Sequence, residues 1–455
     1  MKGLTISVNK NSTSKVRKAP PKVTIENSSE NLTSQAGLIP VVHFLDKLDF
    51  MGLTRQTLSE QRASNATYEF SDAIYLAVVA ILGGATSVLM IPVVWFDKVL
   101  RQLAGFERIP DQSIFNRIFH CFHFSMVSCL EELNHRMRAR AWKKAFPTEK
   151  SCPGDSSDMW IDADSTVKTV FGTQEGAEKG YNPHKRGALS YHPLLAFCAQ
   201  TKEILQGWFR SGSAYTSNGT VEFLKQLFAH MPTKLRLVFR ADSGFFDGAI
   251  LDFVESRGNG FLIKVKLKNL EDLLSSKDWK PVSRQDGWES CEFFFACRNW
   301  KKARRFVAVR QEKKEEKHAV QPKLPEMKAY DYFCYVVSET ISPWETHKKY
   351  GERATCETWI EEGKNQMGLA HIKTSEFWAN SALFQCAVLA YNTICWMRLC
   401  SGNEILKRWE VKTIRTFLIR VAGKLVKGSR QQTLKTPATH LFAAQWTAWV
   451  RLGIP

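Results

Sequence analysis

The sequence predicts an α/β protein in which an all-α region precedes a mixed core and a helical tail follows it. Three observations support this fold class. Apolar residues recur at helical spacing from Ala36 to about Ala145. From Met159 onward, short apolar runs typical of strands alternate with helical segments, as in layered α/β folds. After Tyr350 the pattern becomes helical again.

The first 148 residues predict two units. Residues 1–35 are basic and lack the apolar stretch of a secretory signal, so we expect a disordered arm. Such an arm either follows DNA phosphates or is a plain solvated tail. Residues 36–148 predict an all-α domain, and a recognition helix within it would make it a helical DNA-binding domain. Its segment RIPDQSIFNRIFHCF (Arg108 to Phe122) has a helix-start signal and apolar residues four apart, which fits a recognition helix or an ordinary helix equally well.

One apolar run raises the question of a membrane. Ala73 to Phe96 is long enough to span a bilayer, but Gly83–Gly84 and Pro92 interrupt it. We therefore expect two buried helices and no membrane partner. The eleven cysteines show no zinc-binding spacing, and we expect reduced thiols in a reducing, cytoplasmic compartment.

The remaining chain divides by its pattern. A turn-rich linker leads from Pro147 to Asp158. Residues 158–266 predict the first part of the core, with strands in MWIDADSTVKTVFG, LRLVFRADS and GFLIKVKLK. Residues 267–345 predict a β-rich insertion, residues 346–400 the second part of the core, and residues 401–455 a basic helical region.

The charge balance indicates the class of partner. The formal net charge is +18 and the pI is about 9.4. Such an excess suits a polyanion, most often nucleic acid, although a generic basic protein has the same composition.

Three acidic residues lie where catalytic groups are often found. Asp164 and Asp242 each end an apolar strand, and ligands of open α/β sheets gather beyond the carboxyl ends of strands. Each aspartate alone could equally cap a helix or form a turn. Asp162 is an alternative to Asp164, because residues two apart on a strand face the same way.

The third acid belongs to YGERATCETWIEEGK (Tyr350 to Lys364). On one helix, four of its side chains fall within a stripe roughly 60° wide: Tyr350, Arg353, Glu357 and Lys364. A solvated helix face with an Arg353–Glu357 pair is the simple interpretation. Glu361 lies near the same stripe and is the alternative to Glu357.

Together these motifs resemble a known family. WIDADST, VFRADSG and YGERATCETWIEEGK are similar to the three acidic motifs of DDE transposases from bacterial insertion sequences, and the spacing of the last matches the YREK signature of one branch. GYNPHKRGALSYHPLLAF (Gly180 to Phe197) resembles the region after the first acid in transposase DDE domain group 1. The resemblance covers about Met159 to Leu399 and implies an RNase H-like core with a β-rich insertion between the second and third acids.

The resemblance also implies a mechanism. It selects Asp164, Asp242 and Glu357 as catalytic residues and as ligands of two Mg²⁺ ions, with Mn²⁺ as a substitute. Two such ions roughly 4 Å apart hold the attacking and leaving oxygens of an in-line displacement. Carboxylates are the hard oxygen ligands that Mg²⁺ prefers, and this chain offers them without a Cys or His cluster.

The implied partners are the terminal inverted repeats and the target DNA, bound by a homodimer in the nucleoid-associated cytoplasm of a bacterium. The expected DNA contacts include the neighbours of Glu357, three basic patches and one tryptophan: Tyr350, Arg353, Lys364, His184, Lys185, Arg186, Lys264, Lys266, Lys268, Arg304, Arg305 and Trp300. The patches could equally be solvated surface, and core packing is the alternative for Trp300. A catalytically silent regulator and a stand-alone nuclease remain alternative functions.

Overall fold

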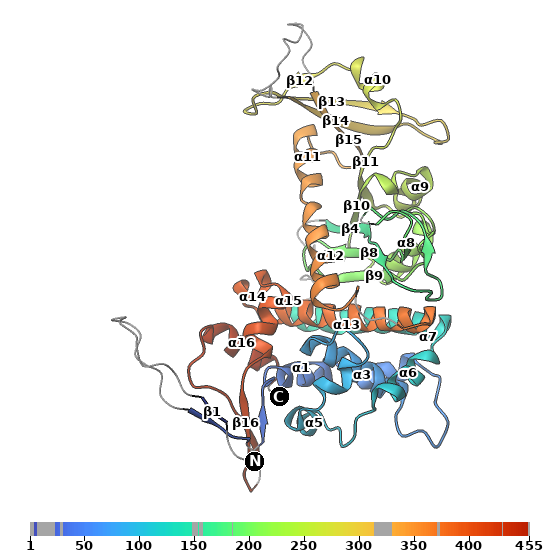
Figure 1. Cartoon of the computed structure of the whole chain (residues 1–455). Helices are drawn as coiled ribbons and strands as arrows, with labels where there is room; N and C mark the ends of the chain where they lie inside the picture. Colours follow the sequence, from blue (N-terminus) through green and yellow to red (C-terminus); the bar gives the residue numbers. More distant parts are fainter. Residues whose placement is uncertain are drawn as a thin grey trace.

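The computed structural model describes residues 4–6, 23–27, 31–147, 153, 158–183, 185–313, 330–370, 374–429 and 431–453. Within these residues the protein is an α/β structure in which a large mixed sheet stands on a helical base (Figure 1). The predicted fold class is confirmed at this level.

The helical base begins with seven helices in the described part of the first 148 residues. They are α1 (Leu38–Lys47), α2 (Phe50–Thr57), α3 (Phe70–Gly83), α4 (Met90–Val94), α5 (Lys98–Leu103), α6 (Gln112–His120) and α7 (Phe124–Ala145). The interrupted apolar run forms α3 and α4, as expected, because Gly84 ends α3 in the left-handed region at φ 110°. No helix of the described residues is long and apolar enough to cross a membrane.

The large sheet has nine strands among the described residues, in the order β12-β13-β14-β15-β11-β10-β4-β8-β9. Their bounds are β4 (Met159–Ser165), β8 (Leu194–Cys198), β9 (Ile204–Trp208), β10 (Leu237–Ala241), β11 (Gly260–Lys264), β12 (Lys280–Pro281), β13 (Trp288–Phe295), β14 (Arg304–Glu312) and β15 (Tyr330–Val337). The central strand β10 runs parallel to both β4 and β11, and the other pairs are antiparallel. A small sheet, β5 (Lys168–Thr169), β7 (Leu189–Tyr191) and β6 (Glu178–Lys179), follows β4.

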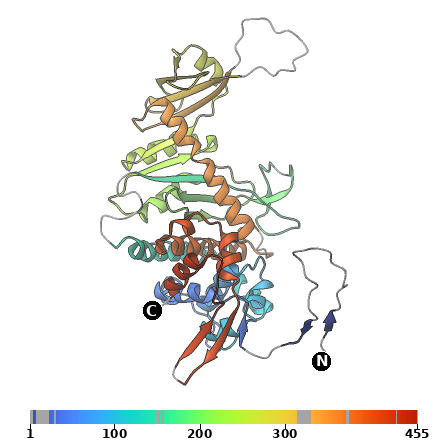
Figure 2. The same cartoon turned by 90° about the vertical axis from the view of Figure 1, so that its left-hand side faces the viewer.

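Helices cover both faces of the large sheet. Helices α8 (Thr220–Ala229) and α9 (Gly248–Ser256) lie on one face, and α11 (Pro343–Gly351) and α12 (Ala354–Gln366) run along the other (Figures 1 and 2). The short elements η1 (Ser243–Phe245) and α10 (Leu270–Ser275) complete this region. The alternation in β4 explains the layering, because Ile161 and Ala163 pack toward α8 and α9 while Asp162 and Asp164 face the other way.

One buried helix, α13 (Phe377–Cys400), lies between the large sheet and the helical base. Most of its residues are buried on all sides, since it lies between α7, α3 and β9. A helix whose residues are mostly apolar and buried on every side is stable only between other elements. It therefore connects the sheet to the helical base (Figure 1).

The C-terminal region differs from the helical expectation. It contains α14 (Glu404–Arg408), α15 (Val411–Ile414), the π-helical turn η2 (Arg415–Ile419) and α16 (Ala443–Gly453), but also a hairpin of β16 (Gly423–Lys427) and β17 (Gln432–Lys435). The β-branched and aliphatic run in GKLVK favours a strand, and pairing with β3 (Leu32–Thr33) completes a sheet. In the N-terminal arm, β1 (Leu4–Ile6) pairs with β2 (Val23–Ile25), and the remaining residues up to Glu30 lie outside the described part except for residues 26–27.

Candidate active site

The first two acids lie side by side at one edge of the large sheet. The parallel register pairs Ala163 of β4 with Ala241 of β10, so Asp164 and Asp242 occupy the next positions of two neighbouring strands. Asp242 also caps the short η1 helix, because its Oδ1 accepts a hydrogen bond of 2.9 Å from the Gly244 amide. The predicted convergence at the carboxyl ends of the strands is therefore present.

The third acid reaches the same edge from α12. Cys356, next to Glu357, is buried against β4, and its Sγ lies 3.9 Å from the Asp162 carbonyl oxygen. The Glu357 side chain is 66% exposed, so it lies at the open side of the site.

Arg353 joins two of the acids. Its Nη2 lies 2.8 Å from Asp164 Oδ2, and its Nη1 lies 3.3 Å from Glu357 Oε1. The side chain is only 7% exposed. Burial alone would lower the pKa of Arg353, but the charges of Asp164, Tyr350 and Asp242 together outweigh burial and raise the pKa above its ordinary value. The Arg353–Glu357 contact of the simple interpretation is present, whereas the pairing of Arg353 with Asp164 could not be read from helix spacing.

Asp164 has the perturbed environment of a functional carboxyl. Burial raises its pKa from 3.8 to about 6, Arg353 opposes this rise, and the charges of Asp242 and Glu357 add to it. Asp242 and Glu357 therefore both lie within electrostatic range of Asp164.

The structure separates Asp164 from its alternative, Asp162. The Asp162 side chain is 0% exposed, and Arg240 donates two hydrogen bonds to it, of 2.5 Å and 2.8 Å. Arg240 also donates to the Lys349 carbonyl and lies 3.4 Å from Glu352. Asp162 is therefore engaged in a buried ion pair, while Asp164 faces the site.

Arg240 is a residue that sequence reasoning missed. It lies on β10 two positions before Asp242, and it connects two strands to the end of α11. The sequence does contain a signal for its role. Arg240 is the second arginine of the otherwise apolar run LRLVFRA, and a charged group inside a buried strand requires a buried partner.

The expected single helix from Tyr350 to Lys364 is divided in the structure. Helix α11 ends at Gly351 and α12 begins at Ala354. At the junction the backbone tightens into bonds between residues three apart, such as Arg353 N to Tyr350 O at 3.0 Å. The one-helix expectation is therefore wrong. In a continuous helix the Arg353 amide would donate to the Lys349 carbonyl, but that carbonyl accepts a hydrogen bond from Arg240.

Tyr350 and Lys364 flank the acids but contact the protein itself. The Tyr350 ring packs on Tyr335 with centroids 4.6 Å apart, and burial raises its pKa to about 12. Lys364 Nζ donates to the Val167 carbonyl at 3.3 Å, and burial lowers its pKa. Glu361, the alternative to Glu357, is exposed on the same helix.

The basic patches have different environments. Lys185 and Arg186 are exposed, and the Lys185 ammonium lies 4.9 Å from the Phe171 ring centre. His184 lies outside the described residues. The three lysines Lys264, Lys266 and Lys268 are all exposed, although β11 ends at the first of them.

Three expected contacts belong instead to the protein's own packing. Arg304 is buried and bonds to Asp252 and Glu255, and its guanidinium lies over the Trp300 ring at 4.8 Å. Trp300 packs on Phe246 and Phe306. Arg305 bonds to Glu292 and to the carbonyls of Glu339 and Ile341. These contacts use the groups that DNA would need, so none of the three is retained as a DNA contact.

The donor set suits a hard divalent cation. The described residues contain no group of three His, Cys, Asp or Glu side chains already arranged around one metal position. The positive guanidinium of Arg353 nevertheless lies between Asp164 and Glu357. A cation is thus already held by two of the three carboxylates, and oxygen donors of this kind are those that Mg²⁺ prefers.

Comparison with known proteins identifies the family. The sequence pattern of transposase DDE domain group 1 matches residues 15–451. No curated protein matches the chain. A cryo-EM structure of the piggyBac transposase synaptic complex with hairpin DNA aligns with a TM-score of 0.43 and 14% sequence identity, covering 86% of this chain and 81% of that chain. Since the family pattern spans nearly the whole chain, the protein belongs to the transposase DDE domain group 1 family and is a DNA transposase.

Proposed function

We propose that this transposase binds the terminal inverted repeats of its element and performs cut-and-paste transposition with Asp164, Asp242 and Glu357 as its catalytic residues. The observation that carries the proposal is the position of these acids. Two lie in adjacent register on parallel strands, and the third is joined to the first by a shared arginine.

The strand order supports an RNase H-like core in this proposal. In the order β9-β8-β4-β10-β11, three antiparallel strands are followed by two parallel ones, and Asp164 and Asp242 lie at the ends of β4 and β10. Residues 158–266 and 346–400 then form the core, and residues 267–345 its insertion. Residues 36–148 form the helical DNA-binding domain, and the regions 1–35 and 401–455 flank these units.

The three carboxylates would hold two Mg²⁺ ions, with Mn²⁺ as a substitute. Bound there, the ions would supply Lewis acidity to the attacking and leaving oxygens of the phosphodiester. The remaining steps rely on the chain's own residues. A DNA phosphate offers Arg353 a bidentate partner in place of its carboxylates, while Tyr350 and Lys364 border the strand.

The reaction has two balanced displacements. Water attacks the phosphorus at the element end, and the bond to the 3′-oxygen breaks to leave a 3′-hydroxyl. That hydroxyl then attacks a target phosphorus and displaces the target's own 3′-oxygen. Two element ends must be paired for this, so we propose a homodimer on DNA, acting in the nucleoid-associated cytoplasm of a bacterium.

Isosteric substitutions test the catalytic assignment. Asp164→Asn, Asp242→Asn and Glu357→Gln should each abolish Mg²⁺-dependent cleavage of end DNA while the dissociation constant for that DNA changes little. Glu361→Gln is the matched control, because it removes an exposed carboxylate from the same helix. Full cleavage by any of the first three variants would remove that residue from the site.

The same assay separates the alternative functions. A silent regulator would bind end DNA and leave it intact in Mg²⁺. A stand-alone nuclease would cleave the ends without joining them to a target duplex.

A further inference from the structure

The two ends of the chain meet in one small sheet remote from the acids. Among the described residues, β3 pairs with β16, and β16 pairs with β17, to form a three-stranded sheet that we call the terminal sheet. The β16–β17 hairpin projects away from the helical base (Figure 2). The terminal sheet therefore presents a surface that the catalytic core does not cover.

The surrounding sequence is strongly cationic. Between Val411 and Pro455 the chain contains eight lysines and arginines and no aspartate or glutamate. Arg415 is used internally, because it donates to the carbonyls of Ile81, Leu82 and Gln366. The hairpin lysines, in contrast, are exposed: Lys424, Lys427 and Lys435.

The strand register concentrates this charge. Lys424 of β16 lies directly opposite Lys435 of β17, so two positive side chains share one face of the ladder. Like charges in this position oppose strand pairing, whereas an anion near both removes that cost. Lys427 lies toward the tip of the hairpin, and because it is three positions after Lys424 its side chain extends from the opposite face of the ladder.

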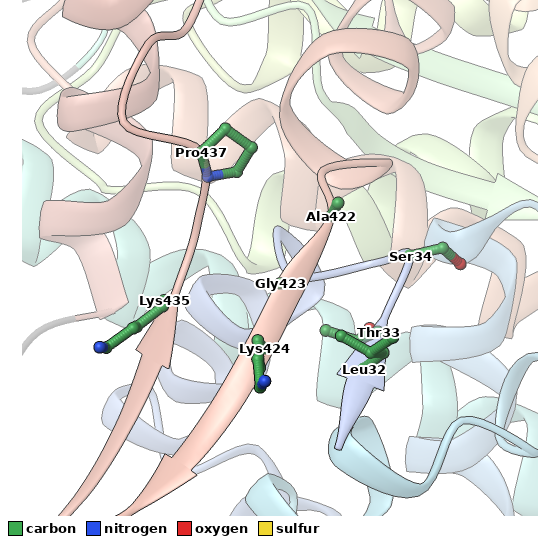
Figure 3. A pocket seen from close by; sticks show the side chains of 8 residues that line it. All are labelled: Leu32, Thr33, Ser34, Ala422, Gly423, Lys424, Lys435 and Pro437. Atoms are coloured by element: carbon green, nitrogen blue, oxygen red, sulfur yellow. The ribbon is translucent and has the colours of Figure 1, made fainter. Parts of the chain in front are cut away.

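A hollow adjoins the two opposed lysines. Its volume is about 440 Å³, and Leu32, Thr33 and Ser34 line its far side (Figure 3). The hollow is open to solvent and mostly apolar, and Lys424 and Lys435 are among its lining residues, so their positive charge lies beside a surface that a DNA backbone can approach.

Side-chain hydrogen bonds join the terminal sheet to the helical base. Thr33 Oγ1 donates to Asp97 Oδ2 at 2.5 Å, and Gln102 Nε2 donates to Gln432 Oε1 at 3.0 Å. The first contact joins β3 to the residue before α5, and the second joins β17 to the last turn of α5. A binding surface fixed in this way loses little conformational freedom on association.

We propose that the terminal sheet is a second DNA-binding site, which holds the phosphate backbone of duplex DNA away from the scissile phosphate. The inference rests on the proposed function, since it supplies a contact to the end DNA that the catalytic core cleaves. Charge complementarity selects the occupant, because exposed lysines in a region of the sequence, Val411 to Pro455, that contains no aspartate or glutamate suit a polyanion.

The test is a triple variant, Lys424→Gln, Lys427→Gln and Lys435→Gln. Its matched control is Lys225→Gln, Lys234→Gln and Lys280→Gln, which removes the same charge from exposed positions outside the proposed DNA-binding regions. Binding of a fluorescent end duplex is measured by anisotropy at several salt concentrations. Each lost phosphate contact lowers the slope of log affinity against log salt by about one, so we expect a decrease of about two to three.

The outcomes separate this inference from the proposed function. A triple variant with the affinity and salt slope of the control overturns the inference, even if the acid substitutions abolish cleavage. Weaker binding to a single strand with unchanged binding to duplex overturns the assignment to duplex DNA. If the acid substitutions leave cleavage intact, the proposed catalytic site fails while the binding result for the terminal sheet stands separately. Matching thermal unfolding of both triple variants shows that they are folded.

Discussion

Replacing Arg240 by glutamine tests how the third acid is brought beside the first two. Arg240 connects β10 to β4 through Asp162 and to the end of α11 through the Lys349 carbonyl. Glu357 lies on α12, which begins three residues after the end of α11, so the attachment of α11 contributes to its position. We expect Arg240→Gln to reduce both stability and the rate of strand cleavage.

The structure gives the size of the stability loss. Arg240 is 1% exposed and its partner Asp162 is 0% exposed, so the glutamine variant leaves a buried carboxylate without its counter-charge. Removing one partner of such a pair costs about 3–5 kcal/mol. A displacement of about 1 Å in a catalytic group can lower a rate by about 100-fold. We expect a loss of that order at a temperature where the variant is folded.

Arg304→Gln is the matched control. Arg304 is also a buried arginine in the large sheet, but its partners Asp252 and Glu255 are 38% and 22% exposed and retain water. Its loss should cost about 1.5–3 kcal/mol, as expected for hydrogen bonds to charged groups, and should leave the cleavage rate unchanged.

Adding Asp162→Asn to Arg240→Gln separates stability from positioning. The double variant no longer contains the orphaned carboxylate, so most of the unfolding free energy should return. The cleavage rate under single-turnover conditions should stay low, because the link to the Lys349 carbonyl is still missing. Recovery of the full rate in the double variant, or a wild-type rate in Arg240→Gln itself, would refute this reasoning.

Three further predictions follow from the same geometry. In EDTA, the unfolding free energy of the protein should fall as pH rises through about 6, because the folded state retains the Asp164 proton that the unfolded state loses near 3.8. Chemical denaturation should show Asp164→Asn to be more stable than wild type by up to about 3 kcal/mol above pH 6, and equally stable near pH 3. Arg353→Gln should bind Mn²⁺ several-fold more tightly without DNA, as measured by electron paramagnetic resonance, and weaker binding would contradict the view of the guanidinium as a substitute cation. Gly37→Ala should lower stability by about 3 kcal/mol, because its Cβ would lie 1.6 Å from the Leu418 carbonyl oxygen, whereas Gly351→Ala meets no atom within 4 Å and should unfold like wild type.

Much of the fold could be predicted because its signals are local. The break between α3 and α4 follows from Gly83–Gly84, and the strand ending at Asp242 follows from its apolar run. The prediction for residues 401–455 was incomplete, because the hairpin gains its third strand from β3 at the opposite end of the chain. Pairing at that separation leaves no periodic trace in a single window of sequence.

In the candidate site, too, some features could be predicted from the sequence and others could not. The order and spacing of the three acidic motifs indicated the transposase family, and the match over residues 15–451 shows it. The roles of Arg304, Arg305 and Trp300 were not readable, because a basic residue in solvent and one paired with a distant carboxylate look alike in sequence. Only the fold shows which charges are already engaged.

The sequence by itself determined the local elements, the positive charge and the family, since each depends on residues close together in the chain. The tertiary structure decided which of two aspartates on one strand faces the site and which is buried against Arg240. It also placed Arg353 between Asp164 and Glu357 and joined the two ends of the chain in one basic sheet. These outcomes depend on contacts between distant segments, whose free energy arises only when the whole core is packed.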